Sequence, residues 1–224
     1  KFIQKQNIDK ELFIVSDLFA KNQKIVSVKA LDAIHFNHIL NTNSSWIKDE
    51  VRNNISDILW EDITSKKNNE YLESKIQNKF SIKMFIQEDF QIIKNDENFL
   101  WIGRGYPYRW LTFGKYINRI DNISSKEFWY QLEYFFKNHI PEIKLVDALR
   151  FEEKLVINEN NFLIARGLYD HSESSTGGPF VIYIFEGIIE NELILVSGFI
   201  NNPGFEKMFL LKQLEVMIQK IKYK

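Results

Sequence analysis

The 224-residue chain is 45% hydrophobic and 26% charged, a composition typical of a folded globular protein with a sizeable core. Its 29 Lys and Arg residues nearly balance its 30 Asp and Glu residues, and without clustered positive charge we expect no nucleic-acid partner. The absence of cysteine excludes disulfides, thiolate metal sites and cysteine nucleophiles.

The first part of the chain predicts two short strands followed by helices. The strands are expected over residues 11–15 and 24–29, which are rich in β-branched residues. Asp32 can accept a bond from a free backbone N–H, and so can cap a short helix over residues 33–40. Residues 46–62 and 68–78 carry apolar side chains at helical spacing, which predicts two further helices.

The middle of the chain predicts a strand-rich region and one strongly marked helix. Strands are expected over residues 80–86, 99–103, 109–117 and 147–157. Ser124 and Glu127 form a capping box, in which a hydroxyl and a carboxylate each accept from a free backbone N–H at the helix start. The helix that follows ends before Pro141 and places His139 near its C-terminus, where a partly charged imidazole is favourable.

The most sheet-like stretch lies between residues 158 and 203. Three runs rich in β-branched and aromatic residues alternate with segments rich in Gly, Asn and Ser: residues 161–166, 180–186 and 193–200. This pattern predicts a meander of three antiparallel strands. Asn202 and Pro203 fit the start of a last helix over residues 205–221.

Together these elements predict a single α+β domain over residues 1–224, with a mostly antiparallel sheet covered by helices on one face. No apolar run approaches the roughly 18 residues that a membrane-spanning helix needs, so we expect no transmembrane segment.

A faint repeat relates two parts of the chain. Residues 95–100 recur as residues 158–163, and Arg104-Gly105 recurs as Arg166-Gly167. This predicts two duplicated helix–strand–strand–strand halves, at about residues 32–118 and 124–200. Chance is an equal alternative, because Asn, Phe and Leu are abundant.

The densest cluster of aromatic and arginine residues is the main candidate for ligand binding. Its members are Trp101, Arg104, Tyr106, Tyr108, Arg109 and Trp110. Aromatic faces can stack on flat ligands and Arg can bind carboxylate or phosphate. Alternation along the strand predicts that Phe99 and Trp101 face one way while Leu100, Ile102 and Arg104 face the other. The alternative is a structural hairpin with packed rings and cation–π contacts.

Arg166 joins this candidate site if the duplication is real, because it would occupy a position equivalent to that of Arg104. Two converging arginines would form an anion site. Alternatively, each arginine pairs with a local carboxylate such as Asp170 or Glu173.

The segment from Asp170 to Thr176 holds the strongest combination of catalytic residue types. His171 with Asp170 or Glu173 could serve a hydrolase. The alternative is a solvated connector that bends at Gly177 and Gly178, with Pro179 opening an edge strand.

Metal and cofactor sites are not expected. His35 and His38 lie three residues apart on a predicted helix, but no further ligand pattern accompanies them. The glycines of this chain match no phosphate-binding loop.

Several motifs together resemble an uncharacterised family of secreted Bacteroidota proteins. They are Ala20-Lys21-Asn22-Gln23, Asn98-Phe99-Leu100-Trp101, Arg166-Gly167-Leu168-Tyr169, Gly177-Gly178-Pro179-Phe180, Phe199 and Lys212-Gln213-Leu214-Glu215. Tyr169 and Thr176 stand where members of this family have Trp and Met. The resemblance implies a cell-envelope location, a lipoprotein-type signal and a further N-terminal portion, and it implies no activity.

Two functions follow as hypotheses. The first is a non-catalytic envelope protein that binds a small ligand or an envelope partner protein through the aromatic–arginine hairpin. The second is a hydrolase that uses His171 beside the Gly-Gly-Pro bend.

Overall fold

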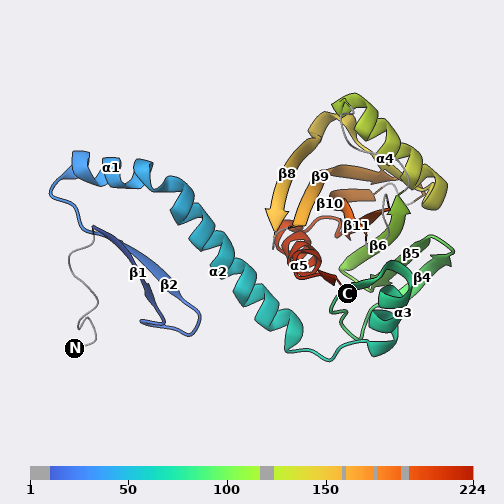
Figure 1. Cartoon of the computed structure of the whole chain (residues 1–224), viewed down its shortest axis with the longest axis horizontal. Helices are drawn as coiled ribbons and strands as arrows, with labels where there is room; N and C mark the ends of the chain where they lie inside the picture. The colour runs from blue at the N-terminus through green and yellow to red at the C-terminus, as the bar shows by residue number, and fades with distance from the viewer. Residues whose placement is uncertain (1–10, 117–123, 158–159, 174–175, 188–191, 224) are drawn as a thin grey trace. The chain divides into compact units, whose positions relative to one another are not determined.

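The computed structural model describes residues 11–116, 124–157, 160–173, 176–187 and 192–223. The chain divides into two compact units, Lys1–Asp62 and Ile63–Lys224, where the sequence predicts one domain. Figure 1 shows the elements of both units.

The first unit is a strand pair followed by helices. Strands β1 (Leu12–Ser16) and β2 (Lys24–Val28) pair antiparallel. Helices α1 (Ala33–Thr42) and α2 (Ser44–Thr64) follow. The predicted cap is confirmed, because the Asp32 carboxylate accepts from the backbone N–H of His35 at 2.8 Å.

The second unit is built on a curled antiparallel sheet of eight strands (Figure 1). Seven strands follow one another across the sheet: β4 (Gln91–Asp96), β5 (Phe99–Arg104), β6 (Tyr108–Tyr116), β11 (Leu193–Asn201), β10 (Thr176–Glu186), β9 (Asn160–His171) and β7 (Ile143–Leu145). Strand β8 (Phe151–Ile157) pairs with β9 beside β7. The predicted meander is therefore confirmed as β9, β10 and β11.

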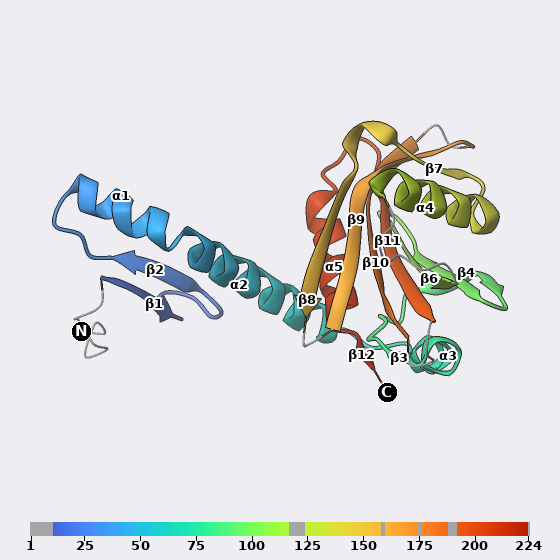
Figure 2. The ribbon, with the colours of Figure 1, turned by 45° about the horizontal axis from the view of Figure 1, so that its top comes forward.

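Helices cover both faces of this sheet (Figure 2). Helix α4 (Ser125–His139) packs on one face, where Phe135 contacts Phe99 and Trp129 contacts Phe180. Helices α3 (Glu70–Phe80) and α5 (Met208–Gln219) pack on the opposite face. The predicted α+β class is confirmed. The sequence predicts helices on one face only, whereas in the structure α4 covers one face and α3 and α5 cover the other.

Two glycines allow the helices to approach the sheet closely. A Cβ at Gly114 would lie 2.4 Å from Phe135 of α4, and a Cβ at Gly198 would lie 3.0 Å from Leu214 of α5. These two positions face opposite sides of the sheet, so on each face the missing side chain leaves room for the helix that crosses there.

The structure corrects several predicted boundaries. Phe80 ends α3, so the predicted strand over residues 80–86 shrinks to β3 (Ile82–Lys83), which pairs with β12 (Lys222–Tyr223). Residues 147–149 form a 3₁₀ turn before β8. Helix α5 begins at Met208, and Asn202 does not cap it; its amide donates to the carbonyl of Glu206 instead.

The repeat stays a prediction. Residues 95–100 comprise the turn of the β4–β5 hairpin and the paired strand ends beside it, while residues 158 and 159 of the second copy lie outside the described residues.

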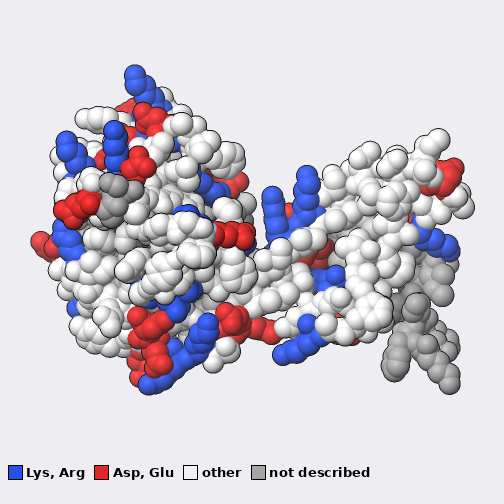
Figure 3. All heavy atoms as spheres, turned by 180° about the vertical axis from the view of Figure 1, so that it is seen from behind, with Lys and Arg blue, Asp and Glu red and all other residues white. Residues whose placement is uncertain are grey.

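Within the described part of the chain, no helix has both the length and the apolar character that crossing a bilayer requires. On the face drawn in Figure 3, basic and acidic side chains are interspersed over the sheet unit.

Candidate functional site

Five rings gather at one end of the sheet, on the face that α4 covers. They are Trp101 of β5, Tyr106 of the β5–β6 turn, Tyr108 and Trp110 of β6, and His171 of β9, and we call them the aromatic surface. The predicted alternation is confirmed on β5: Phe99 contacts Phe135 and His139 of α4, while Arg104 contacts Phe90 on the other side.

The rings form a continuous chain of contacts. Trp101 and Trp110 meet edge to face with ring centroids 5.6 Å apart, and Tyr108 lies 6.5 Å from Trp110. Tyr106 meets Tyr108 at 6.0 Å. Trp110 also lies 6.0 Å from His171, although two strands separate β6 from β9. The curl of the sheet brings these distant strands together.

The floor of the aromatic surface is buried. Tyr169 contacts both Trp110 and Phe199, and its hydroxyl donates to the carbonyl of Ile200 at 3.1 Å. Burial raises the pKa of Tyr169 well above its usual value, so this hydroxyl stays protonated and acts only as a structural donor.

The rim of the aromatic surface is accessible. Tyr106 is 60% exposed and Tyr108 is 45% exposed, while Trp101, Trp110 and His171 are half-buried. Rings that are partly buried and partly exposed are already restricted in motion, so they can stack on a ligand with little further loss of side-chain entropy.

On the face of the aromatic surface, three polar atoms at this end of the sheet are buried without a hydrogen-bond partner among the described residues. They are Nε1 of Trp101, Nδ1 of His171 and Oδ1 of Asn201. Asn201 pairs with Tyr108 across the β6–β11 ladder, and its amide nitrogen donates to Thr176 Oγ1 at 2.9 Å. Buried polar atoms usually have partners, so one donor, one acceptor and one imidazole nitrogen below the aromatic surface are left without a hydrogen bond among the described residues.

The three predicted arginines lie on the other face of the sheet. Arg104 forms an ion pair with Asp89 and donates to Gln87 Oε1 at 2.7 Å. Arg109 donates to Gln213 Oε1 at 2.5 Å. Arg166 lies on β9, and three strands separate it from Arg104. The structure therefore separates the arginines from the aromatic residues. Arg104 and Arg109 lie opposite each other on β5 and β6, but three strands separate Arg166 from Arg104, so the predicted pairing of Arg104 with Arg166 is not seen.

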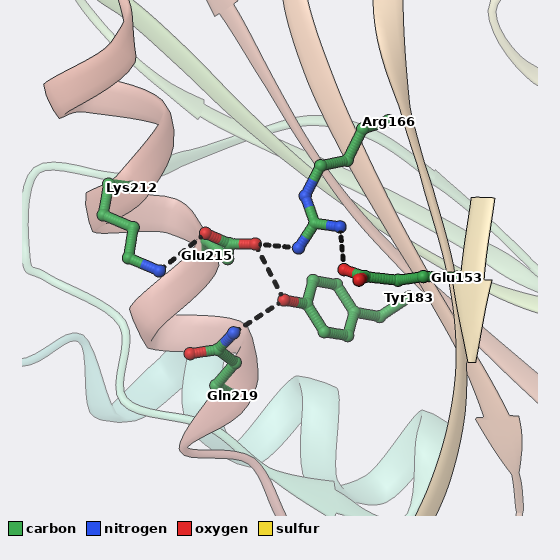
Figure 4. A network of polar contacts seen from close by, with 6 residues as sticks. All are labelled: Glu153, Arg166, Tyr183, Lys212, Glu215 and Gln219. Carbon is green, nitrogen blue, oxygen red and sulfur yellow. Dashed lines mark hydrogen bonds and ion pairs between the residues drawn. The ribbon is translucent and has the colours of Figure 1, made fainter. Parts of the chain in front are cut away.

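Arg166 belongs to a polar network between α5 and the sheet (Figure 4). It bonds Glu153 of β8 and Glu215 of α5. Glu215 also accepts from Lys212 Nζ at 2.9 Å and from the Tyr183 hydroxyl at 3.0 Å. The carboxylates that hold Arg166 are thus not the predicted Asp170 and Glu173.

The charges in this network stabilise one another. Burial would raise the pKa of Glu215, but the charge of Lys212 and the bonds from Arg166 outweigh it and hold that pKa below its usual value. Burial likewise disfavours a charged Arg166, but Glu215 raises the pKa of the guanidinium above its usual value. Every charge has an internal partner, so the network fixes α5 and β8 to the sheet and offers no free group to a ligand.

The predicted hydrolase residues do not form a catalytic set. Asp170 and His171 are neighbours on β9, so their side chains point to opposite faces of the sheet. Glu173 is exposed in the turn beyond β9. The strands also run further than predicted, with β9 reaching His171 and β10 starting at Thr176; Ser174 and Ser175 lie outside the described residues.

Pro179 lies inside a central strand, and the prediction of an edge strand there is wrong. The β10–β11 ladder starts one residue later, at Phe180, so the missing N–H of Pro179 falls outside that ladder.

Among the described residues, no group of three or more His, Asp or Glu side chains could hold a metal ion. The ring of His35 contacts Glu11 at 3.2 Å and accepts from the backbone N–H of Leu31.

Sequence reasoning missed Asn201, whose Asn-Asn-Pro context predicts a helix cap, and it placed His171 in a separate loop. The alternation of side chains along β9, continued beyond Arg166, could have placed His171 on the face opposite to that of Arg166.

The fold and the site define an α+β module with an open aromatic surface at the end of its sheet. The chain belongs to the family described as Domain of unknown function (DUF4837), whose model matches residues 68–220. The resemblance to an uncharacterised family is thereby confirmed at the level of the family. No curated protein matches the sequence.

Solved structures share parts of the arrangement at low identity. A Bacteroides thetaiotaomicron VPI-5482 protein is 10% identical with a TM-score of 0.38, and the match covers 64% of this chain and 45% of that one. The Saccharomyces cerevisiae Ran-binding protein Mog1p is 8% identical with a TM-score of 0.41, and a mutant of the protein Mog1 is 10% identical with a TM-score of 0.40; both matches cover 64% of this chain and 90% of theirs.

Proposed function

We propose that this protein is a non-catalytic binding module, and that the aromatic surface holds an uncharged, ring-bearing ligand such as an oligosaccharide. The observation that carries the proposal is the chain of five contacting and partly exposed rings at one end of the sheet.

The chemistry of the surface supports an uncharged ligand. Its rings present flat apolar faces, and the unpaired atoms belong to an indole, an imidazole and a side-chain amide. The accessible faces of the rings offer stacking to such a ligand, whereas the three unpaired atoms are buried in the free protein and add hydrogen bonds only where binding exposes them. The predicted arginines are already paired on the other face and form no part of this proposal.

A hydrolase is less well supported by the same geometry. Catalysis by a His base in a triad needs a third group that orients the imidazole, and Nδ1 of His171 has no hydrogen-bond partner among the described residues.

A location in the cell envelope is the second part of the proposal. It is supported by the resemblance to secreted proteins, and an envelope protein that binds saccharides fits that location. Fractionation of the source cells tests it, because recovery of the protein in the cytosol would contradict it.

A binding assay with matched variants tests the ligand proposal. Wild-type protein is titrated by calorimetry with chitohexaose, maltohexaose and xylohexaose, with polygalacturonate as a charged comparison. Tyr106→Ala and Tyr108→Ala should weaken the binding of a neutral oligosaccharide by roughly tenfold each, since an aromatic contact contributes about 1–1.5 kcal/mol. Tyr130 of α4 is 67% exposed and lies outside the surface, so Tyr130→Ala is the control. Binding of none of the three neutral oligosaccharides, or equal binding by all variants, would refute the proposal.

A further inference from the structure

Strand β8 presents an open edge at one end of the large sheet. Among the described strands it pairs with β9 alone. The strand at the other end, β4, is interrupted by a register shift between Ile92 and Lys94, a feature that discourages pairing with another chain. Strand β8 pairs along seven residues without a shift, so its outer edge can accept a further strand.

The side chains of β8 are unusually apolar for an open edge. Phe151 is 56% exposed, Leu155 37% and Val156 64%. Phe151, Glu153 and Leu155 face the α5 side of the sheet, because Glu153 bonds Arg166 there. Glu152 and Lys154 therefore face the opposite side.

Two charges on β8 lack partners. Oε2 of Glu152 has no hydrogen-bond partner among the described residues, and Lys154 is exposed and forms no ion pair with a described carboxylate. Glu153, by contrast, is neutralised by Arg166 of its own chain. Glu153, which is paired with Arg166, is therefore flanked on β8 by side chains of opposite charge, Glu152 and Lys154.

We infer that β8 pairs antiparallel with β8 of a second copy of this chain, across a two-fold axis at Glu153. Such an axis stands perpendicular to the sheet, so residues that face each other must lie on the same side of it. With Glu153 opposite itself, Phe151 lies opposite Leu155 of the second copy, and Glu152 lies opposite its Lys154.

This register gives β8 two kinds of favourable contact. Each copy gains a Phe–Leu contact at either end of the pair and an ion pair on either side of the axis, both of which stabilise neighbouring strands. A register centred on Lys154 is unfavourable, because it places two unpaired lysines opposite each other and sets Glu152 opposite Val156. The central Glu153 residues tolerate proximity because each has its own Arg166.

Charge reversal and exchange test the inference with the full chain. The wild-type protein should sediment with twice the chain mass. Lys154→Glu should yield monomers, since it sets two acidic side chains opposite each other on both sides of the axis. The double exchange Glu152→Lys with Lys154→Glu should restore the dimer. A monomeric wild type, a dimeric Lys154→Glu protein or a monomeric exchange variant would each overturn the proposed pairing.

A cross-linking experiment reports the register independently of these charges. The chain has no cysteine, so Glu153→Cys introduces a single thiol that faces its own copy across the axis and should form an intermolecular disulfide on mild oxidation. Val156→Cys is the control, because its two copies would lie about 20 Å apart at about 3.4 Å per residue. Efficient cross-linking at position 156, or none at position 153, would contradict the register. Neither variant alters the aromatic surface, so the dimer and the proposed ligand binding stand or fall separately.

Discussion

Replacement of Glu215 by Gln should destabilise the sheet unit more than any exposed charge replacement. The side chain of Glu215 is 11% exposed, and its carboxylate accepts from Arg166, Lys212 and Tyr183. Gln keeps the size of the side chain but removes its charge, so both charge-assisted bonds weaken and the Arg166 guanidinium keeps only Glu153 as an anionic partner.

The expected loss of unfolding free energy is about 2–3 kcal/mol. Hydrogen bonds to charged groups contribute about 1.5–3 kcal/mol each, and breaking a fully buried ion pair costs about 3–5 kcal/mol. The side chains of Arg166 and Lys212 are 29% and 31% exposed, so water replaces part of what is lost. For a unit of this size the midpoint of thermal unfolding should fall by roughly 5–10 °C.

Calorimetric and urea unfolding of the full chain measure this effect. Glu88→Gln is the matched control, because Glu88 forms a 3.3 Å ion pair with Lys67 that is largely exposed and should contribute less than about 1 kcal/mol. Since the pKa of Glu215 is held below its usual value, its contribution is present above the unfolded pKa of about 4.3 and is lost as the pH falls through the folded pKa. If Glu215→Gln were no more destabilising than Glu88→Gln, the network would not fix α5 to the sheet.

Two other perturbations have defined outcomes. His139 stacks on Phe99 at 4.3 Å, and burial together with the charge of Lys94 holds its pKa below the usual value. The contribution of a neutral His139 to stability is therefore present above the unfolded pKa of about 6.5 and lost as the pH falls below it. In His139→Gln, the urea midpoints at about pH 7 and about pH 5 should lie closer together than in the wild type. An unchanged pH dependence would show that the ring is not buried. Gly114→Val should lower the free energy of unfolding by roughly 1–3 kcal/mol, because its Cβ would overlap Phe135. Gly105→Ala is the control, because a Cβ there has no atom within 4 Å and should leave the thermal midpoint unchanged. Equal effects of the two substitutions would contradict the close packing of α4.

Local signals in the sequence predicted local structure well. The Ser124 hydroxyl accepts from the backbone N–H of Glu127, and α4 ends before Pro141. Both features depend only on residues within a few positions of one another. The meander was also predictable, because its strands are contiguous in sequence and rich in β-branched residues.

Features that depend on distant strands were not predictable in the same way. Strand β4 was missed because Ile92 and Ile93 are adjacent and exposed, so the run shows no alternation. The helix end was expected to favour a charged His139, but burial and the charge of Lys94 lower the pKa of this imidazole. The ring is stacked on Phe99 of the distant strand β5.

In the candidate site, too, features set by nearby residues were predictable and features set by distant strands were not. Alternation on β5 correctly separated Trp101 from Arg104. The approach of His171 to Trp110 depends on the curl of the sheet across β11 and β10, which no short stretch of sequence encodes.

The most direct test of binding at the aromatic surface is the nuclear magnetic resonance signal of the indole N–H groups. The chain has five Trp residues, and single Trp→Phe variants assign their signals. On addition of the neutral oligosaccharide that binds most tightly, the signals of Trp101 and Trp110 should shift, while that of the buried Trp129 should stay in place. Shifts confined to other tryptophans, with Trp101 and Trp110 unchanged at saturation, would contradict the proposed site.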